Sequence, residues 1–198
     1  MISAAPLRRT VRKIRVCAAQ YQMRPITCWD DLERQVQFFV ETADEYHCHF
    51  LLFPEMFTAQ LFSMLPRNMD SLDAVKEVAK FHQQYVDMFT KFATDHGLYI
   101  IGGSHPVEVE GELRNVAHLF TPSGEVHTQE KIHITAGERR YYDIQPGDKL
   151  RVFETPLGRI GILLCYDIEF PELSRLLALH GVEVLFVPFS TDERKAYY

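Results

Sequence analysis

The feature of this sequence that most constrains its fold is the alternation of short apolar runs with longer segments of helical periodicity. Short runs rich in β-branched and aromatic residues predict buried strands when proline, glycine or charge follows them. A chain that alternates such strands with amphipathic helices predicts an α/β fold. The predicted strands span 14–20, 50–53, 99–102, 116–120, 128–131, 150–154, 159–164 and 184–189.

Three segments between these strands carry apolar residues at helical spacing, and the predicted helices span 27–47, 72–97 and 171–181. Thr27 and Asp30 have the spacing of a capping box at the start of the first helix. The second is predicted as one long amphipathic helix that ends at a glycine, a residue suited to left-handed backbone. Together with the strands, these helices indicate one α/β unit.

Composition limits the kinds of partner this chain can have. Its 198 residues carry a formal net charge of −6, whereas nucleic-acid binding rests on clustered Lys and Arg. No segment approaches the roughly 18 consecutive apolar residues that span a bilayer. We therefore predict one domain over residues 14–198 that binds a small molecule, with neither nucleic acid nor membrane as a partner.

The N-terminal segment has a charge of its own. No acidic residue precedes Asp30, and we interpret residues 1–13 as a solvated basic leader or a linker remnant. A cleaved organellar presequence is the alternative, which the short length and Pro6 disfavour. The basic residues crowded into the first fifteen positions are Arg8, Arg9, Arg12, Lys13 and Arg15.

The cysteines favour neither a metal site nor a disulfide framework, because they form no C-x-x-C pair and have no regular spacing. His47, Cys48 and His49 resemble metal ligands, but adjacent residues on an extended chain point to opposite faces. We therefore predict reduced thiols in the cytoplasm, with no metal and no other cofactor. The cysteines are Cys17, Cys28, Cys48 and Cys165.

Three reactive side chains stand at or just beyond the ends of predicted strands, where α/β sheets present functional groups. Glu55, Lys131 and Cys165 supply a base, a cation and a nucleophile, which is the set that a thiol-dependent acyl transfer needs. The same base and cation are expected to favour the thiolate form of Cys165. On spacing alone, an inert buried cysteine with two surface charges remains the alternative.

The sequence around each of these residues narrows the interpretation. The motifs LFPE at 52–55, EKIH at 130–133 and LCYDIEFPE at 164–172, in this order, resemble the nitrilase superfamily of carbon-nitrogen hydrolases. The resemblance covers the chain from Ile14 onward and includes RNVA at 114–117 and PSGE at 122–125. It implies an α/β fold of the four-layer α-β-β-α sandwich type. Because family members extend further, we expect this fold to be incomplete at the C-terminal end. Family members also form homodimers or larger homo-oligomers, so the resemblance implies a homo-oligomer.

The resemblance also implies a role for each site residue. Glu55 is the expected general base, Cys165 the nucleophile and Lys131 the cation beside the oxyanion. The backbone N–H of Tyr166 is the expected second oxyanion donor. Glu138 matches a second glutamate that orients the lysine or the substrate in amide-cleaving relatives. The alternative interpretation of Glu138 is an exposed charge on a loop. The implied activity is hydrolysis of a non-peptide carbon–nitrogen bond through a thioester.

Tyr166 and Asp167 follow the nucleophile, where nitrilases commonly carry tryptophan, so the resemblance favours a small amide or carbamoyl-amide as substrate. Nitrile hydrolysis by the same triad is one alternative, and a catalytically inactive fragment acting as a binding module is another. A serine hydrolase using Ser104 is a third, although no G-x-S-x-G elbow is present. Asp167 is expected to have a structural role, pairing with charges such as Arg175.

Overall fold

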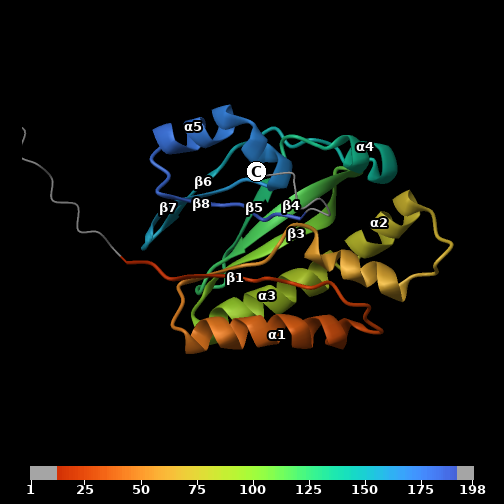
Figure 1. The fold of residues 1–198 in the computed structure, drawn as a ribbon, viewed down its shortest axis with the longest axis horizontal. Coiled ribbons are helices and arrows are strands. Elements are labelled where there is room, and N and C mark those ends of the chain that lie inside the picture. The colour runs from red at the N-terminus through yellow and green to blue at the C-terminus, as the bar shows by residue number, and fades with distance from the viewer. Residues whose placement is uncertain (1–12, 191–198) are drawn as a thin grey trace, which may run out of the picture.

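Two β-sheets lie face to face between two layers of helices in the computed structural model, which describes residues 13–190 (Figure 1). The first sheet has the order β1-β2-β3-β4-β5 and the second the order β6-β7-β8. Helices α1 (Trp29–Glu45) and α3 (His82–His96) cover the outer face of the first sheet, and α5 (Pro171–Leu179) covers the second. The expected four-layer α-β-β-α sandwich is confirmed.

The first sheet mixes parallel and antiparallel pairing. Strands β1, β2 and β3 are parallel to one another, as expected for strands separated by helices, whereas β3, β4 and β5 form an antiparallel meander. Its strands are β1 (Val16–Ala18), β2 (Phe50–Leu52), β3 (Tyr99–Val109), β4 (Glu112–Phe120) and β5 (Val126–Glu130).

The second sheet joins an antiparallel hairpin to one parallel strand. Its strands are β6 (Val152–Thr155), β7 (Gly158–Ile162) and β8 (Val184–Phe186), so the last strand is shorter than predicted. The remaining elements are α2 (Ser71–Ala79), α4 (Ala136–Tyr142) and two 3₁₀ segments, η1 (Phe57–Met64) and η2 (Cys165–Glu169).

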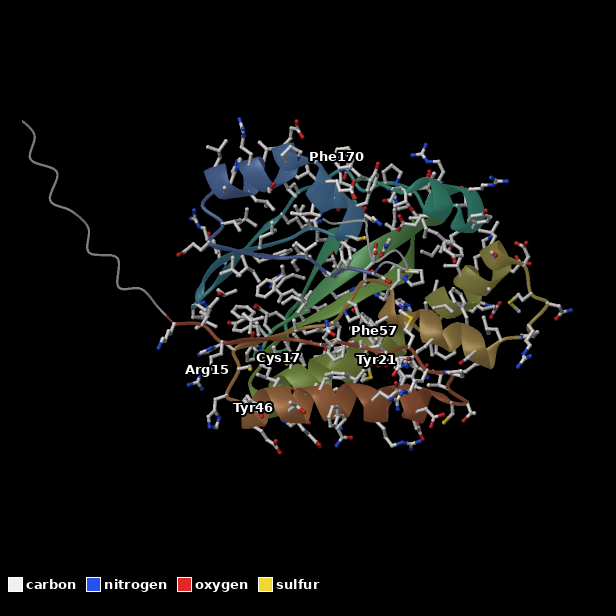
Figure 2. The ribbon with its side chains drawn as sticks, in the orientation of Figure 1. Arg15, Cys17, Tyr21, Tyr46, Phe57 and Phe170 are labelled. Atoms are coloured by element: carbon white, nitrogen blue, oxygen red, sulfur yellow. The ribbon has the colours of Figure 1, made fainter. Side chains whose placement is uncertain are left out.

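Apolar side chains fill each interface between layers. Phe50 and Ile101 of the first sheet meet Ile160 and Phe186 of the second, and the rings of Phe50 and Phe186 lie 5.0 Å apart. On the helical side of the first sheet, the rings of Tyr21 and Phe57 lie 5.5 Å apart in a larger aromatic cluster (Figure 2). Burial of aromatic surface on both faces of the first sheet fixes its position in the sandwich.

The predicted helix over 72–97 is in fact two helices, α2 and α3, with a break at Lys80 and Phe81. The ring of Phe81 stacks on Trp29 at 5.7 Å with the planes 1° apart. The break allows α2 to pack Val75 against a separate small cluster, while α3 stays over the first sheet. The helical periodicity predicted over 72–97 is present on both sides of the break. The change in the direction of the helix at the break depends on tertiary contacts.

The first helix begins one residue later than the predicted capping box implies. Cys28 is its N-cap, and Asp31 rather than Asp30 accepts the backbone N–H of Thr27 at 2.8 Å and that of Cys28 at 3.3 Å. A carboxylate caps the start of this helix, as predicted, but it belongs to the residue one position later in the sequence.

Strand β3 is much longer than the predicted 99–102 and contains an irregularity that positions the candidate site. The register with β4 shifts between Ile101 and Ser104. Gly103 lies in this bulge with φ +67°, and a Cβ there would lie 2.1 Å from the carbonyl oxygen of Pro54. Only glycine allows this close approach, which fixes the segment leading to Glu55.

One expectation falls mostly outside residues 13–190. It is the basic leader, of which only residue 13 is described. Within the described range, no helix combines the length and hydropathy needed to cross a bilayer.

Candidate active site

The three predicted reactive residues come from different parts of the chain and meet in the structure. Glu55 follows β2, Lys131 follows β5, and Cys165 opens η2 after β7. The Nζ of Lys131 lies 2.7 Å from Oε1 of Glu55, and the Cys165 thiol lies near enough to the Glu55 carboxylate for each group to shift the pKa of the other. All three side chains are buried.

The backbone at Cys165 is in the left-handed region with φ 43°, which is uncommon for a residue with a side chain. Its N–H donates to the carbonyl of Pro188 at 2.9 Å, and its thiol also approaches the carbonyl of Ser190 at 3.6 Å. Residues held in this region persist only where the surrounding structure fixes them, and such positions cluster at active sites.

Glu138 is brought to the same cluster by a helix that the sequence pattern did not predict. It is the third residue of α4, where its carboxylate accepts the N–H of Thr135 at 3.0 Å while its own N–H donates to the Thr135 hydroxyl at 3.2 Å. The same carboxylate lies 2.7 Å from the Nζ of Lys131. Its side chain is 13% exposed, so the alternative of an exposed loop charge is wrong.

Sequence reasoning missed Asn115, which belongs to the cluster. It lies in β4, buried, and its Nδ2 donates to Oε1 of Glu55 at 3.1 Å and to Oε1 of Glu138 at 2.9 Å. The RNVA motif at 114–117 was the available signal, since a polar residue within an otherwise apolar strand needs a buried partner.

Burial and charge act in opposite directions on the ionisable groups. Burial raises the pKa of Glu55, and the nearby ammonium of Lys131 offsets only part of this effect. Burial also disfavours the charged form of Lys131, but two carboxylates outweigh it and its pKa lies above the usual value. For Glu138, Lys131 and its hydrogen bonds outweigh burial, so its pKa is lowered.

The expected thiolate at Cys165 is contradicted by its surroundings. Burial, followed by the negative charge of Glu55, raises the pKa of Cys165 to about 11. Lys131 lowers the pKa of Cys165 by less than these two effects raise it. Cys165 is therefore a protonated thiol near neutral pH, in the vicinity of the Glu55 carboxylate.

Asp167 connects the lysine segment with the cysteine turn. Its buried carboxylate accepts the N–H of His133 at 2.7 Å and the N–H of Leu164 at 3.2 Å. The expected structural role is present, but it acts through backbone donors rather than through an ion pair with Arg175. Tyr166, the residue between Cys165 and Asp167, packs its ring edge-on against Phe170 at 5.2 Å.

The alternative nucleophile Ser104 lies within β3 and is fully buried. Its hydroxyl accepts the N–H of Met56 at 3.0 Å and so holds the turn that follows Glu55. Among residues 13–190, no histidine or carboxylate hydrogen-bonds to this hydroxyl. The observed role of this side chain is to hold the turn that carries Glu55.

The motif that resembled metal ligands is used differently. His49 accepts the backbone N–H of Arg15 through Nδ1 at 2.9 Å. Across the described residues, no group of three or more His, Cys, Asp or Glu side chains is arranged to hold a metal ion.

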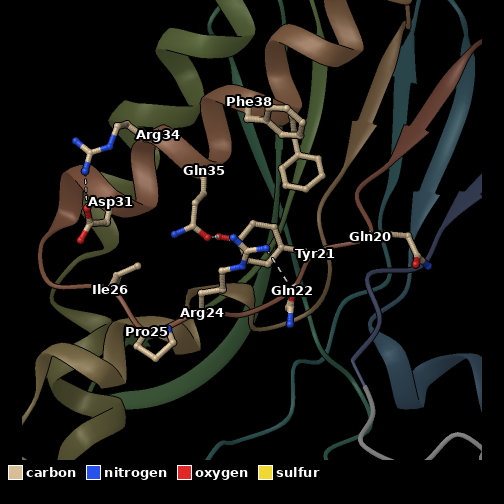
Figure 3. A pocket seen from close by; sticks show the side chains of 11 residues that line it. Gln20, Tyr21, Gln22, Arg24, Pro25, Ile26, Asp31, Arg34, Gln35 and Phe38 are labelled. Carbon is tan, nitrogen blue, oxygen red and sulfur yellow. Dashed lines mark hydrogen bonds and ion pairs between the residues drawn. The ribbon is translucent and has the colours of Figure 1, made fainter.

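Two cavities flank the segment at 20–22. The larger, of about 750 Å³, is lined by Tyr21, Arg24, Gln35 and the Asp31–Arg34 ion pair (Figure 3). The other, of about 530 Å³, is lined by Pro54 and Ser190 together with Gln20, Gln22 and their neighbours. The second cavity adjoins Cys165, because the carbonyl of Ser190 contacts the Cys165 thiol.

Comparison with known proteins shows the family to which this chain belongs. The family model for carbon-nitrogen hydrolases matches residues 15–197. The probable hydrolase YhcX of Bacillus subtilis is 42% identical over 184 residues, which cover 93% of this chain and 36% of YhcX. The omega-amidase NIT2 of Xenopus tropicalis is 29% identical over 184 residues, which cover 89% of this chain and 63% of NIT2. The chain thus spans less than two thirds of either relative.

Solved structures show the same fold. A mutant of the Nesterenkonia AN1 amidase from the nitrilase superfamily superposes with a TM-score of 0.73 at 22% identity, covering 92% of this chain and 67% of that chain. The carbon-nitrogen hydrolase of Helicobacter pylori G27 gives 0.74 at 21% identity, covering 90% and 60%. With the family match over nearly all of its length, this chain belongs to the carbon-nitrogen hydrolases.

Proposed function

We propose that this chain carries the active site of an enzyme that hydrolyses a carbon–nitrogen bond in a small amide or carbamoyl-amide. The observation that carries the proposal is the buried contact of Lys131 with Glu55, with the buried Cys165 thiol close enough to this carboxylate for its charge to raise the thiol pKa. A base, a cation and a nucleophile sequestered from water are what acyl transfer to a thiol requires.

Acylation begins with the proton of the thiol. As Sγ of Cys165 attacks the carbonyl carbon of the substrate, the proton passes to the Glu55 carboxylate, so a free thiolate is never required. The oxyanion that forms is stabilised by the Lys131 ammonium and by the backbone N–H of Tyr166. When the C–N bond breaks, protonated Glu55 gives its proton to the leaving nitrogen, and a thioester remains on Cys165.

In deacylation, water replaces the thiol as the attacking group, and Glu55 and Lys131 keep their roles. Glu55 takes a proton from the water as its oxygen attacks the thioester carbonyl, and Lys131 again stabilises the oxyanion. The C–S bond breaks, the proton returns from Glu55 to sulfur, and the carboxylic acid leaves. The raised pKa of Glu55 suits it to both directions of transfer, since a base with a pKa nearer to neutrality exchanges protons efficiently.

Glu138 supports this cycle by its charge. It also contacts Lys131, at 2.7 Å, so the ammonium keeps a counter-ion while Glu55 is protonated. An uncompensated ammonium at this depth would lose its proton more readily. Glu138 therefore keeps Lys131 charged when the oxyanion forms.

The substrate class is inferred from Tyr166 after the nucleophile and from the naming of one relative as an omega-amidase. Nitrile hydrolysis by the same triad is the second candidate. A binding module without turnover is the third. We also propose a cytoplasmic location and a homo-oligomeric form.

Rapid-quench mass spectrometry of Cys165 distinguishes these candidates. The purified protein is mixed with amides, ureido acids or nitriles, and the peptide containing Cys165 is weighed, with Cys165→Ala as the control. An amide should give an acyl adduct lighter than the substrate by one ammonia, and a ureido acid an S-carbamoyl adduct. A nitrile adduct retaining the full substrate mass would favour the second candidate. Saturable binding of these compounds without adduct or product would contradict an enzymatic role.

A further inference from the structure

Asn115 closes a ring of polar side chains around the candidate base. Lys131 bridges Glu55 and Glu138 on one side at 2.7 Å to each. On the other side, the Nδ2 of Asn115 bridges the same two carboxylates at 3.1 and 2.9 Å. The ring therefore holds two carboxylates, one ammonium and one neutral amide; Glu55, Lys131 and Asn115 are buried, and the side chain of Glu138 is 13% exposed.

The orientation of this amide is determined by its neighbours. If oxygen and nitrogen were exchanged, the carbonyl oxygen would face two carboxylate oxygens, which accept hydrogen bonds and do not donate them. The observed orientation leaves Oδ1 of Asn115 without a hydrogen-bond partner among the described residues, although it is buried. A buried acceptor without a donor is unfavourable. The benefit of an asparagine here must lie in its two N–H donors.

Charge explains why a neutral donor suits this position. The ring has one positive and two negative groups, so one negative charge is in excess. A second lysine would neutralise it and would hold Glu55 so firmly in its ionised form that it became a weaker base. An amide stabilises both carboxylates by hydrogen bonds and adds no charge.

We infer that Asn115 is a positioning residue that keeps the Glu55 carboxylate ionised, separated from Glu138 and directed at the Cys165 thiol. The inference rests on the proposed function, because it assigns Asn115 a part in preparing the base for proton transfer. It does not require Asn115 to contact the substrate.

The titratable groups that face this amide are few. Asn115 shares the ring with three titratable groups, Glu55, Glu138 and Lys131. A fourth titratable group, Cys165, interacts with the ring through Glu55. The neighbouring Arg114 has its own partners, Glu112 and the carbonyl of Pro146. A pH effect of changing Asn115 should therefore arise from the carboxylate pair.

The test is the pH dependence of Cys165 alkylation by iodoacetamide from pH 5 to 10, which needs no substrate. Asn115→Asp keeps the shape but places a third carboxylate in the ring, and Asn115→Leu removes the donor. Either change makes the carboxylate cluster take up a proton at higher pH. We expect the acidic limb of the rate profile to move upward by about one unit, a roughly tenfold slower reaction at any pH on that limb, with the rates converging at higher pH.

A neighbouring variant separates this role from a purely structural one. Val116 is buried in the same strand but faces away from the ring, as residues alternate along a strand. Val116→Ala should lower the melting temperature and leave the acidic limb in place. The same result for Asn115→Asp would overturn the inference, and this near-isosteric variant decides the matter if Asn115→Leu does not fold.

Failure of the proposed function gives a different result. If Cys165 of the unaltered protein reacted no faster than Cys17 below pH 8 and showed no acidic limb, Glu55 would not act as its base. The inference about Asn115 would then fail together with the triad. An acidic limb in the unaltered protein that both Asn115 variants leave unmoved would overturn the inference alone.

Discussion

The Nζ of Lys131 and Oε1 of Glu55 lie 2.7 Å apart, with the lysine side chain 1% and the glutamate side chain 7% exposed. Removing two such charges from water is costly, and their attraction compensates only when the remaining hydrogen-bonding capacity is also met. Glu138 and Asn115 supply those additional partners. The four residues should therefore respond to mutation as one unit.

Replacing Lys131 should affect both stability and activity. In Lys131→Met, two carboxylates remain buried without their cation, and breaking a buried pair in this way costs about 3–5 kcal/mol of unfolding free energy. Loss of the oxyanion partner should lower the acylation rate at least about 100-fold. Urea denaturation and quenched-flow acylation measure the two effects. Lys149→Met, at an exposed position, should change neither.

Cys165 should depend on Glu55 for its reactivity, because the pKa of its thiol is raised to about 11. In Glu55→Gln the proton acceptor is lost, so alkylation of Cys165 at pH 7 should become slower than that of the exposed Cys28. Peptide mapping after brief iodoacetamide treatment gives both rates in one sample. Unchanged labelling of Cys165 in this variant would identify another group as the base.

The contribution of Glu138 to stability should vanish in acid. Its folded-state pKa is lowered, chiefly because the charge of Lys131 outweighs burial. Its charge therefore stabilises the fold above the unfolded pKa, near 4.3, and this stabilisation is lost as the pH falls through the folded pKa. Unfolding free energies of the unaltered protein and Glu138→Gln should differ at pH 7 and converge toward pH 3. Glu172→Gln, at an exposed helix start, provides a comparison with no such convergence.

Two glycines in left-handed conformation should differ sharply in their tolerance of alanine. Gly111 has φ +82° and open space around the missing Cβ, so Gly111→Ala carries only conformational strain of about 1–2 kcal/mol. At Gly103 the added Cβ would also lie 2.1 Å from the Pro54 carbonyl. Gly103→Ala should be considerably less stable by urea denaturation and should lose alkylation of Cys165 through displacement of Glu55. Equal behaviour of the two variants would argue against this close approach.

The sequence by itself determined the layered α/β fold and the identity of the reactive side chains. Apolar periodicity is set by neighbouring residues along the chain, which is why most strands and the helices over 27–47 and 171–181 were predictable. Family motifs placed Glu55, Lys131 and Cys165 at strand ends. Periodicity did not reveal the break at Lys80, because a helix on either side of a bend has the same pattern.

Only the tertiary structure decided how the reactive groups behave. Asn115 is 60 residues away from Glu55 in the chain, and Lys131 is 76 residues away, yet both side chains contact its carboxylate. The thiol of Cys165 is protonated rather than ionised because burial and a carboxylate act on it more strongly than the lysine does. Electrostatic energies depend on distance and desolvation in three dimensions, and neither quantity is encoded in local spacing.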